Sequence, residues 1–184
     1  MIRQGPADSA PFLRCEDLTM RFVRAIASLA LPVVFAATPA AAQEVITEKA
    51  LSLDMAHAIA EGALEKCRAD GNHVSVTVVD RDGLIKVVLR DDGSGPHTLV
   101  TSRRKAFTSV TFRQPSADWA KRVLTEPAVA GLKDTEGTIA LGGGVPIKAG
   151  NEVIGAIGVS GSPGGEKDEA CANAGIQKFA DKLK

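Results

Sequence analysis

The chain beyond residue 43 alternates between two kinds of hydrophobic pattern. After Ser52, apolar side chains recur every three or four residues as far as Ala69, which predicts an amphipathic helix with the serine hydroxyl at its N-cap. Residues 74–79 are almost all β-branched, and a second β-rich run at 84–89 follows an Asp-Gly pair. Two such runs joined by a short glycine turn predict a β-hairpin.

Helical spacing returns at residues 98–111 and, after a proline, in a shorter stretch that ends near Val123. The C-terminal part then predicts three strands separated by glycine-containing turns and one last helix, at residues 138–141, 145–148, 152–160 and 166–183. Strands joined by tight turns pair antiparallel, because a parallel pair needs a long crossover. The element order therefore predicts an α+β domain with an antiparallel sheet of about five strands flanked by helices.

The first 42 residues follow a different pattern. A basic start at residues 20–24, an uncharged apolar run at 25–37 and small residues at 40–42 are the three parts of a secretory signal peptide. The apolar run is shorter than the roughly 20 residues that a membrane-spanning helix needs. We predict a signal peptide at 20–42, an extension before the true start at 1–19, and a periplasmic or secreted domain at 43–184 without stable membrane insertion.

Charge and cysteine content narrow the classes of function. The chain has 22 basic and 22 acidic residues, so its overall charge offers no basis for binding nucleic acid. Cys67 and Cys171 remain after the leader is removed, and an oxidising compartment favours a disulfide between them. The alternative is that both are small buried apolar residues. No Cys-x-x-Cys pair is present, so we expect no thioredoxin-like redox motif.

Three histidines are the candidates for binding a metal or a haem iron. His57, His73 and His97 do not form a His-x-x-x-His pair and none is close to a cysteine, so we expect no zinc site. His97 follows a glycine loop and begins the helix with the basic cluster 103–105, which makes it the first candidate for an axial haem ligand. His57, at the edge of its helix's apolar face, suits a subunit interface or a half-buried ligand. The alternative for both is an exposed histidine without a ligand.

The basic cluster offers cations for an acidic ligand. Arg103, Arg104 and Lys105 point to different sides of a helix, so at most two can serve one site. Lys105 and Thr108 lie within one turn of each other, and we expect them to bind a carboxylate. A catalytic role comes second, because a catalytic lysine needs a pKa lowered by burial, which the sequence does not show. The glycines between residues 155 and 161 lack a following Gly-Lys-Ser/Thr, so we expect them to allow close packing against a strand and not to bind phosphate.

Four segments in a fixed order resemble the GlcG/HbpS family of haem-binding proteins. They are LSLDMA at 51–56, VTVVDRDG at 76–83, RRKAFTS at 103–109 and the glycine-rich stretch GGVPI to VIGAIGVSG at 143–161. The resemblance implies a profilin-like or PAS-like sandwich that assembles as a homo-oligomer, from a dimer to an octamer. Within that family some members bind or degrade haem, and others are found beside glycolate metabolism.

The resemblance therefore implies non-covalent binding of a small molecule, with haem or a related tetrapyrrole as cofactor or ligand. The expected ligand-binding residues are His97, Arg103, Lys105, Thr108 and His57. Two alternatives stay open. One is an enzyme or accessory factor that acts on a small 2-hydroxy or 2-oxo acid of the glycolate type, held by the arginine and lysine side chains. The other is a structural oligomeric domain without a ligand of its own.

Overall fold

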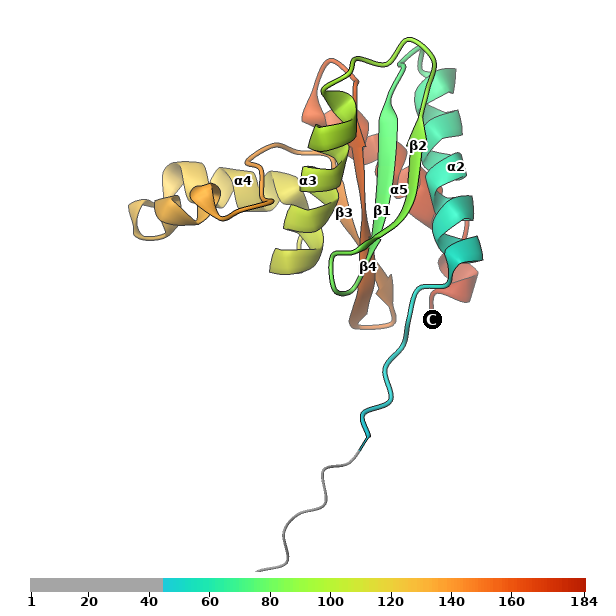
Figure 1. Cartoon of the computed structure of the whole chain (residues 1–184), viewed down its shortest axis with the longest axis horizontal. Helices are drawn as coiled ribbons and strands as arrows, with labels where there is room; N and C mark the ends of the chain where they lie inside the picture. The colour runs from blue at the N-terminus through green and yellow to red at the C-terminus, as the bar shows by residue number, and fades with distance from the viewer. Residues whose placement is uncertain (1–44) are drawn as a thin grey trace, which may run out of the picture. The chain divides into compact units, whose positions relative to one another are not determined.

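A four-stranded antiparallel sheet organises the part of the chain that the computed structural model describes, residues 45–184 (Figure 1). The strands are β1 (Ser75–Asp80), β2 (Ile85–Arg90), β3 (Gly144–Ala149) and β4 (Glu152–Ser160), in the spatial order β2-β1-β4-β3. All three neighbouring pairs are antiparallel. The predicted leader, residues 1–42, lies outside the described residues.

Helices cover both faces of this sheet. They are α2 (Leu53–Ala69), α3 (Thr98–Phe112), α4 (Ser116–Thr125) and α5 (Gly165–Gln177), with 3-10 helices η1 (Pro127–Asp134) and η2 (Ala180–Lys182). The predicted α+β class, with helices flanking an antiparallel sheet, is confirmed. None of the helices in residues 45–184 is both long enough and apolar enough to cross a membrane.

The sheet has four strands because residues 138–141, predicted as a strand, form local turns. The Thr138 amide donates to the Thr135 carbonyl at 3.1 Å, and the Leu141 amide donates to the Ile139 carbonyl at 3.0 Å. The Ile139 amide donates to the hydroxyl of Thr108 at 2.9 Å. Because turns and the Thr108 hydroxyl of α3 bind these amides, the segment forms no ladder with the sheet. The last predicted helix is also shorter than expected, since α5 ends at Gln177.

The face of the sheet under α2 and α5 holds the main apolar core. Its fully buried members include Ile59 from α2 and Val76, Val78, Ile157 and Val159 from the two central strands. In Figure 1, α2 and α5 lie on one side of the sheet and α3 on the other. A disulfide between Cys67 and Cys171 joins α2 to α5, with the two Cα atoms 5.5 Å apart.

The opposite face, under α3, combines hydroxyl groups with a small apolar cluster of Val79, Ala106, Val110 and Ala156. The Ser75 hydroxyl lies 2.7 Å from that of Thr98, and the Thr77 hydroxyl lies 2.8 Å from that of Ser102. A Cβ atom at Gly158 of β4 would lie 2.1 Å from the Ser102 carbonyl oxygen, so only glycine lets α3 pack this closely. Hydroxyl pairs and a glycine contact thus place α3 directly on the central strands.

Candidate functional site

A groove of about 990 Å³ lies between α3, the edge strand β2 and the segment after η1. Its apolar wall consists of Ile85 and Val88 from β2 and Leu99, Val100 and Phe107 from α3. We call this site the α3–β2 groove. Its volume is at the upper end of the range for small-molecule pockets, roughly 300–1,000 Å³.

The groove exists because α3 covers the central strands and leaves the edge strand open. Val88 pairs with Thr77, whose hydroxyl contacts α3, so both side chains are on the α3 face of the sheet. Thr77 is fully buried, whereas Val88 is 41% exposed. Leu99 of α3 is 38% exposed and also lines the groove. The wall is therefore apolar surface that neither layer of the fold covers.

Phe107 is held at one end of the groove by two glycine turns. A Cβ atom at Gly83 would lie 2.8 Å from the phenyl ring, and one at Gly137 would lie 3.0 Å from it. Both glycines have φ near +80°, a conformation that other residues rarely adopt. These turns leave room for the aromatic ring between them and determine where it lies.

Cations stand on the rim of the apolar wall. Arg103 is exposed and has no ion-pair partner within residues 45–184. Arg104 is tethered, because its Nε donates to a backbone carbonyl at 3.0 Å. Lys133 pairs with Asp134 at 2.9 Å, and Glu136 adds a second acid to the lining. The two arginines are thus the cations that an acidic group in the groove would meet.

The structure does not bring His97 and Arg103 together in one site. His97 lines a smaller pocket of about 260 Å³ at the N-terminal end of α3, together with Thr101 and Ser160. Arg103 lines the α3–β2 groove, on another side of the helix. Spacing along α3 explains the separation, because residues six apart point in different directions around a helix.

The other two histidines also lie outside the groove. His57 is exposed on α2, with its Nδ1 3.6 Å from a carboxylate oxygen of Glu61. His73 Nδ1 is 3.1 Å from a carboxylate oxygen of Asp91. Within residues 45–184, no group of three or more histidine, cysteine, aspartate and glutamate side chains could hold a metal ion.

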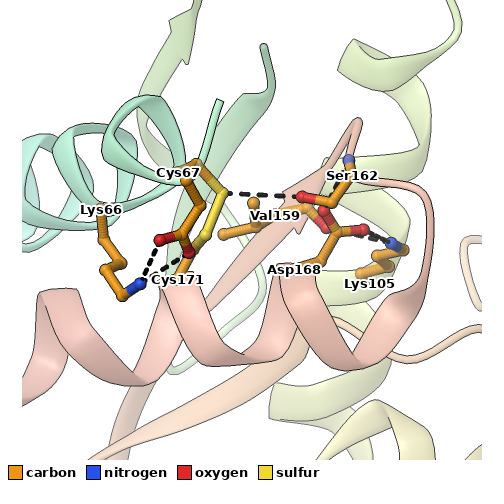
Figure 2. Close-up of a disulfide and its surroundings, with 8 residues drawn as sticks. Lys66, Cys67, Lys105, Val159, Ser162, Asp168 and Cys171 are labelled. Atoms are coloured by element: carbon orange, nitrogen blue, oxygen red, sulfur yellow. Dashed lines mark hydrogen bonds and ion pairs between the residues drawn. A yellow bond between two sulfur atoms is a disulfide. The ribbon is translucent and has the colours of Figure 1, made fainter. Parts of the chain in front are cut away.

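Lys105 and Thr108, expected to bind an external carboxylate, are bonded inside the protein. Lys105 Nζ donates to a carboxylate oxygen of Asp168 at 2.7 Å and to the Val159 carbonyl at 3.0 Å (Figure 2). The two side chains of this pair are only 5% and 3% exposed. The Thr108 hydroxyl donates to a backbone carbonyl of its own helix. Asp168 therefore already provides the carboxylate that Lys105 binds.

Asp91 and Glu169 are among the ionisable groups with shifted pKa values. Hydrogen bonds from the Arg68 guanidinium lower the pKa of Asp91, although the burial of Asp91 acts to raise it. The hydrogen bond with His73 also lowers this pKa. Burial raises the pKa of Glu169, and the nearby charge of Asp118 adds to the rise. Neither group lines the α3–β2 groove.

Sequence reasoning missed most of the groove wall. Ile85, Val88 and Val100 carry no chemical motif, and their pattern is that of ordinary strand and helix residues. The only available signal was the hairpin itself, whose second strand could be an edge strand with one open face. Arg103 was expected among the ligand-binding residues and does line the groove.

A four-stranded antiparallel sheet with helices on both faces and a ligand-sized groove at one edge defines a small α+β sandwich with a candidate binding site. The chain belongs to the family described as haem degrading protein HbpS-like, whose model matches residues 51–177. The resemblance to GlcG and HbpS proteins seen in the sequence is therefore confirmed.

Individual relatives agree with this assignment. A double mutant of HbpS from Streptomyces reticuli is 41% identical, with a TM-score of 0.70 over 78% of this chain and 98% of that one. PduOC, whose structure is that of a haem complex, is 25% identical, with a TM-score of 0.66 over 70% of this chain and 94% of that one. Protein GlcG of Escherichia coli (strain K12) is 29% identical over 121 residues, which are 62% of this chain and 84% of GlcG.

Proposed function

We propose that the domain binds haem or a related tetrapyrrole non-covalently in the α3–β2 groove. The observation that carries this proposal is the combination of a continuous apolar wall with arginines on its rim. A haem has the same two parts, an apolar macrocycle and two carboxylates. Membership of a family described as haem degrading and likeness to the PduOC haem complex support the choice of ligand.

The residues of the groove divide between these two parts of the ligand. The apolar side chains of β2 and α3 would contact the macrocycle, together with the Phe107 ring. Arg103 would bind a propionate, since its guanidinium group offers paired donors that match a carboxylate. Arg104 would offer the donors that are left, because its Nε and one Nη donate to the Thr138 carbonyl. The bound iron would supply the redox and ligand-exchange chemistry, while these residues bind and orient the group.

The groove lining contains no histidine that could coordinate the haem iron, because the three histidines of the chain lie outside the groove. His97 lines another pocket of the same chain. His57 is exposed on α2, so a second copy of the chain could present it. Our proposal includes assembly as a homo-oligomer, from a dimer to an octamer, and makes His57 of a second copy the candidate ligand.

We also propose that the protein is periplasmic or secreted, with residues 20–42 removed. The disulfide between Cys67 and Cys171 supports this, because disulfides persist in oxidising compartments and are rare in the cytosol. The pattern of residues 20–42 is independent support. No observation favours the alternative activity on a small 2-hydroxy or 2-oxo acid, since the charge of Lys105 is matched by Asp168.

Titration of the purified domain with haemin, followed by the Soret band, tests the proposal. Arg103→Ala should weaken binding about tenfold, since hydrogen bonds to charged groups contribute roughly 1.5–3 kcal/mol. Val88→Asn should weaken it by removing apolar contact. Arg122→Ala is the matched control, because Arg122 is an exposed arginine of α4 outside the groove.

The histidines give the second half of the experiment. We expect His97→Ala to leave the Soret band unchanged and His57→Ala to shift it, with the assembly state followed by size-exclusion chromatography. A parent protein that gives no Soret shift would refute haem binding. If haem binds and neither Arg103→Ala nor Val88→Asn weakens it, the groove is not the site.

A further inference from the structure

A second concave region lies at the end of the sheet where β3 turns into β4. That turn is at the bottom of Figure 1. It is a cleft of about 580 Å³ that receives cations from four separate parts of the chain. They are Lys49 before α2, Arg81 in the β1–β2 turn, Arg113 at the end of α3 and Lys148 in β3. We call it the basic cleft, and it shares no lining residue with the α3–β2 groove.

Charge is concentrated in this cleft although the chain as a whole is balanced. Glu152 is the one acidic side chain in its lining, and it pairs with Arg81 at 3.1 Å. Glu48, outside the lining, pairs with the same arginine at 3.0 Å, so the charge of Arg81 is matched. Lys49, Arg113 and Lys148 have no ion-pair partner among residues 45–184. Because like charges held in one cleft repel each other, an anion that enters would relieve an unfavourable arrangement.

The backbone of Arg113 points to the same conclusion. With φ at +55°, Arg113 is the only residue other than glycine in the left-handed region within residues 45–184. It follows the last turn of α3, a position where glycine is favoured because it has no Cβ atom. No hydrogen bond or ion pair to another described residue compensates for this conformation. Arg113 thus keeps a costly backbone conformation at a position where its side chain lines the basic cleft.

We propose that the basic cleft binds a phosphoryl-bearing anion with at least two negative charges. A monoanion would neutralise only one of the three unpaired cations, whereas a dianion or trianion would neutralise two or all three. The cleft offers hydrogen-bond donors from guanidinium and ammonium groups and from the Asn151 amide, and arginine donors match phosphate oxygens in pairs. A free polyphosphate and an anionic lipid headgroup offer this same chemistry.

Calorimetric titration of the domain with inorganic pyrophosphate at fixed ionic strength is the first arm of the test. Arg113→Gly and Lys148→Gln should each weaken binding about fivefold or more, the equivalent of roughly 1 kcal/mol. Glycine keeps the left-handed conformation, so Arg113→Gly should fold at least as well as the parent. Lys121→Gln, on the exposed side of α4 and outside the cleft, is the control.

The second arm measures co-sedimentation with cardiolipin vesicles, whose headgroup carries two phosphate charges, compared with phosphatidylcholine vesicles. Pyrophosphate binding that both variants weaken supports a free anion as the ligand. Co-sedimentation with cardiolipin but not with phosphatidylcholine, lost in both variants and without pyrophosphate binding, supports a headgroup. The proposal is overturned if the parent binds neither probe, or if both variants bind as the parent does. Haemin titration of Arg113→Gly should match the parent, which separates this site from the groove.

Discussion

Replacing Lys105 by methionine removes the cation that faces Asp168 but keeps a side chain of similar length. The carboxylate of Asp168 would then retain one partner, the Ser162 amide at 3.0 Å (Figure 2). Both members of the pair are almost fully buried, with 5% and 3% of their side chains exposed. Removing one partner of a buried ion pair leaves an uncompensated charge, and this costs about 3–5 kcal/mol.

Urea unfolding followed by circular dichroism measures this loss, and the melting temperature should fall by about 10 °C or more. Lys66→Met is the matched control. Lys66 pairs with Asp70 at 2.5 Å, but both side chains are about 40% exposed, so its removal should cost less than about 1 kcal/mol. The double variant Lys105→Met/Asp168→Leu should lose less than the two single variants together, because it leaves no buried charge unpaired.

Two results would refute this reasoning. In the first, Lys105→Met destabilises the domain no more than Lys66→Met does. The burial of the Lys105–Asp168 pair would then have no consequence for the free energy of unfolding. In the second, the losses of the two single variants at Lys105 and Asp168 add fully in the double variant, so the residues would not be coupled.

Three further predictions concern the layers that surround this pair. Gly158→Ala should destabilise the domain by about 1–3 kcal/mol or more in urea unfolding, because its Cβ atom would lie 2.1 Å from a carbonyl oxygen of α3. Gly131→Ala, in open space, is its control. Joint replacement of Cys67 and Cys171 by serine should cost about 2–5 kcal/mol, since the disulfide closes a separation of 104 residues; an unchanged melting temperature would contradict this. Asp91→Asn should lower the melting temperature at pH 7. Because the folded-state pKa of Asp91 is lowered, this difference should shrink as the pH falls below the usual carboxyl value of about 3.9 and through the folded-state pKa. A difference that is the same at pH 7 and pH 2 would contradict the stated cause.

Much of the secondary structure could be predicted from the sequence, since its signals are local. Ser52 caps α2, and its hydroxyl accepts the Met55 amide at 3.2 Å. The Asp-Gly turn at residues 82–83 joins β1 to β2 in antiparallel register, as expected. The prediction of a strand at residues 138–141 was wrong. Its β-rich composition suggests a strand, but the sequence does not reveal that turns and the Thr108 hydroxyl bind its amides.

The candidate site could be predicted only in part, because it depends on contacts between distant parts of the chain. Lys105 looked like a ligand-binding residue because the sequence does not reveal that Asp168, 63 residues away, neutralises it. His97 and Arg103 are close along the chain, yet they line different pockets because the helix turns them in different directions. Arg103 was recognisable as a candidate, but its apolar partners on β2 were not.

The sequence by itself determined where most helices and strands form, that β1 pairs with β2 and β3 with β4, and which family the chain resembles. These properties follow from hydrophobic period, caps and turns within a few residues, and from motifs in a fixed order. Only the tertiary structure decided which polar groups are matched internally and which surfaces remain open. That choice depends on how α3 packs on β1 and β4, which leaves β2 exposed and pairs Lys105 with Asp168.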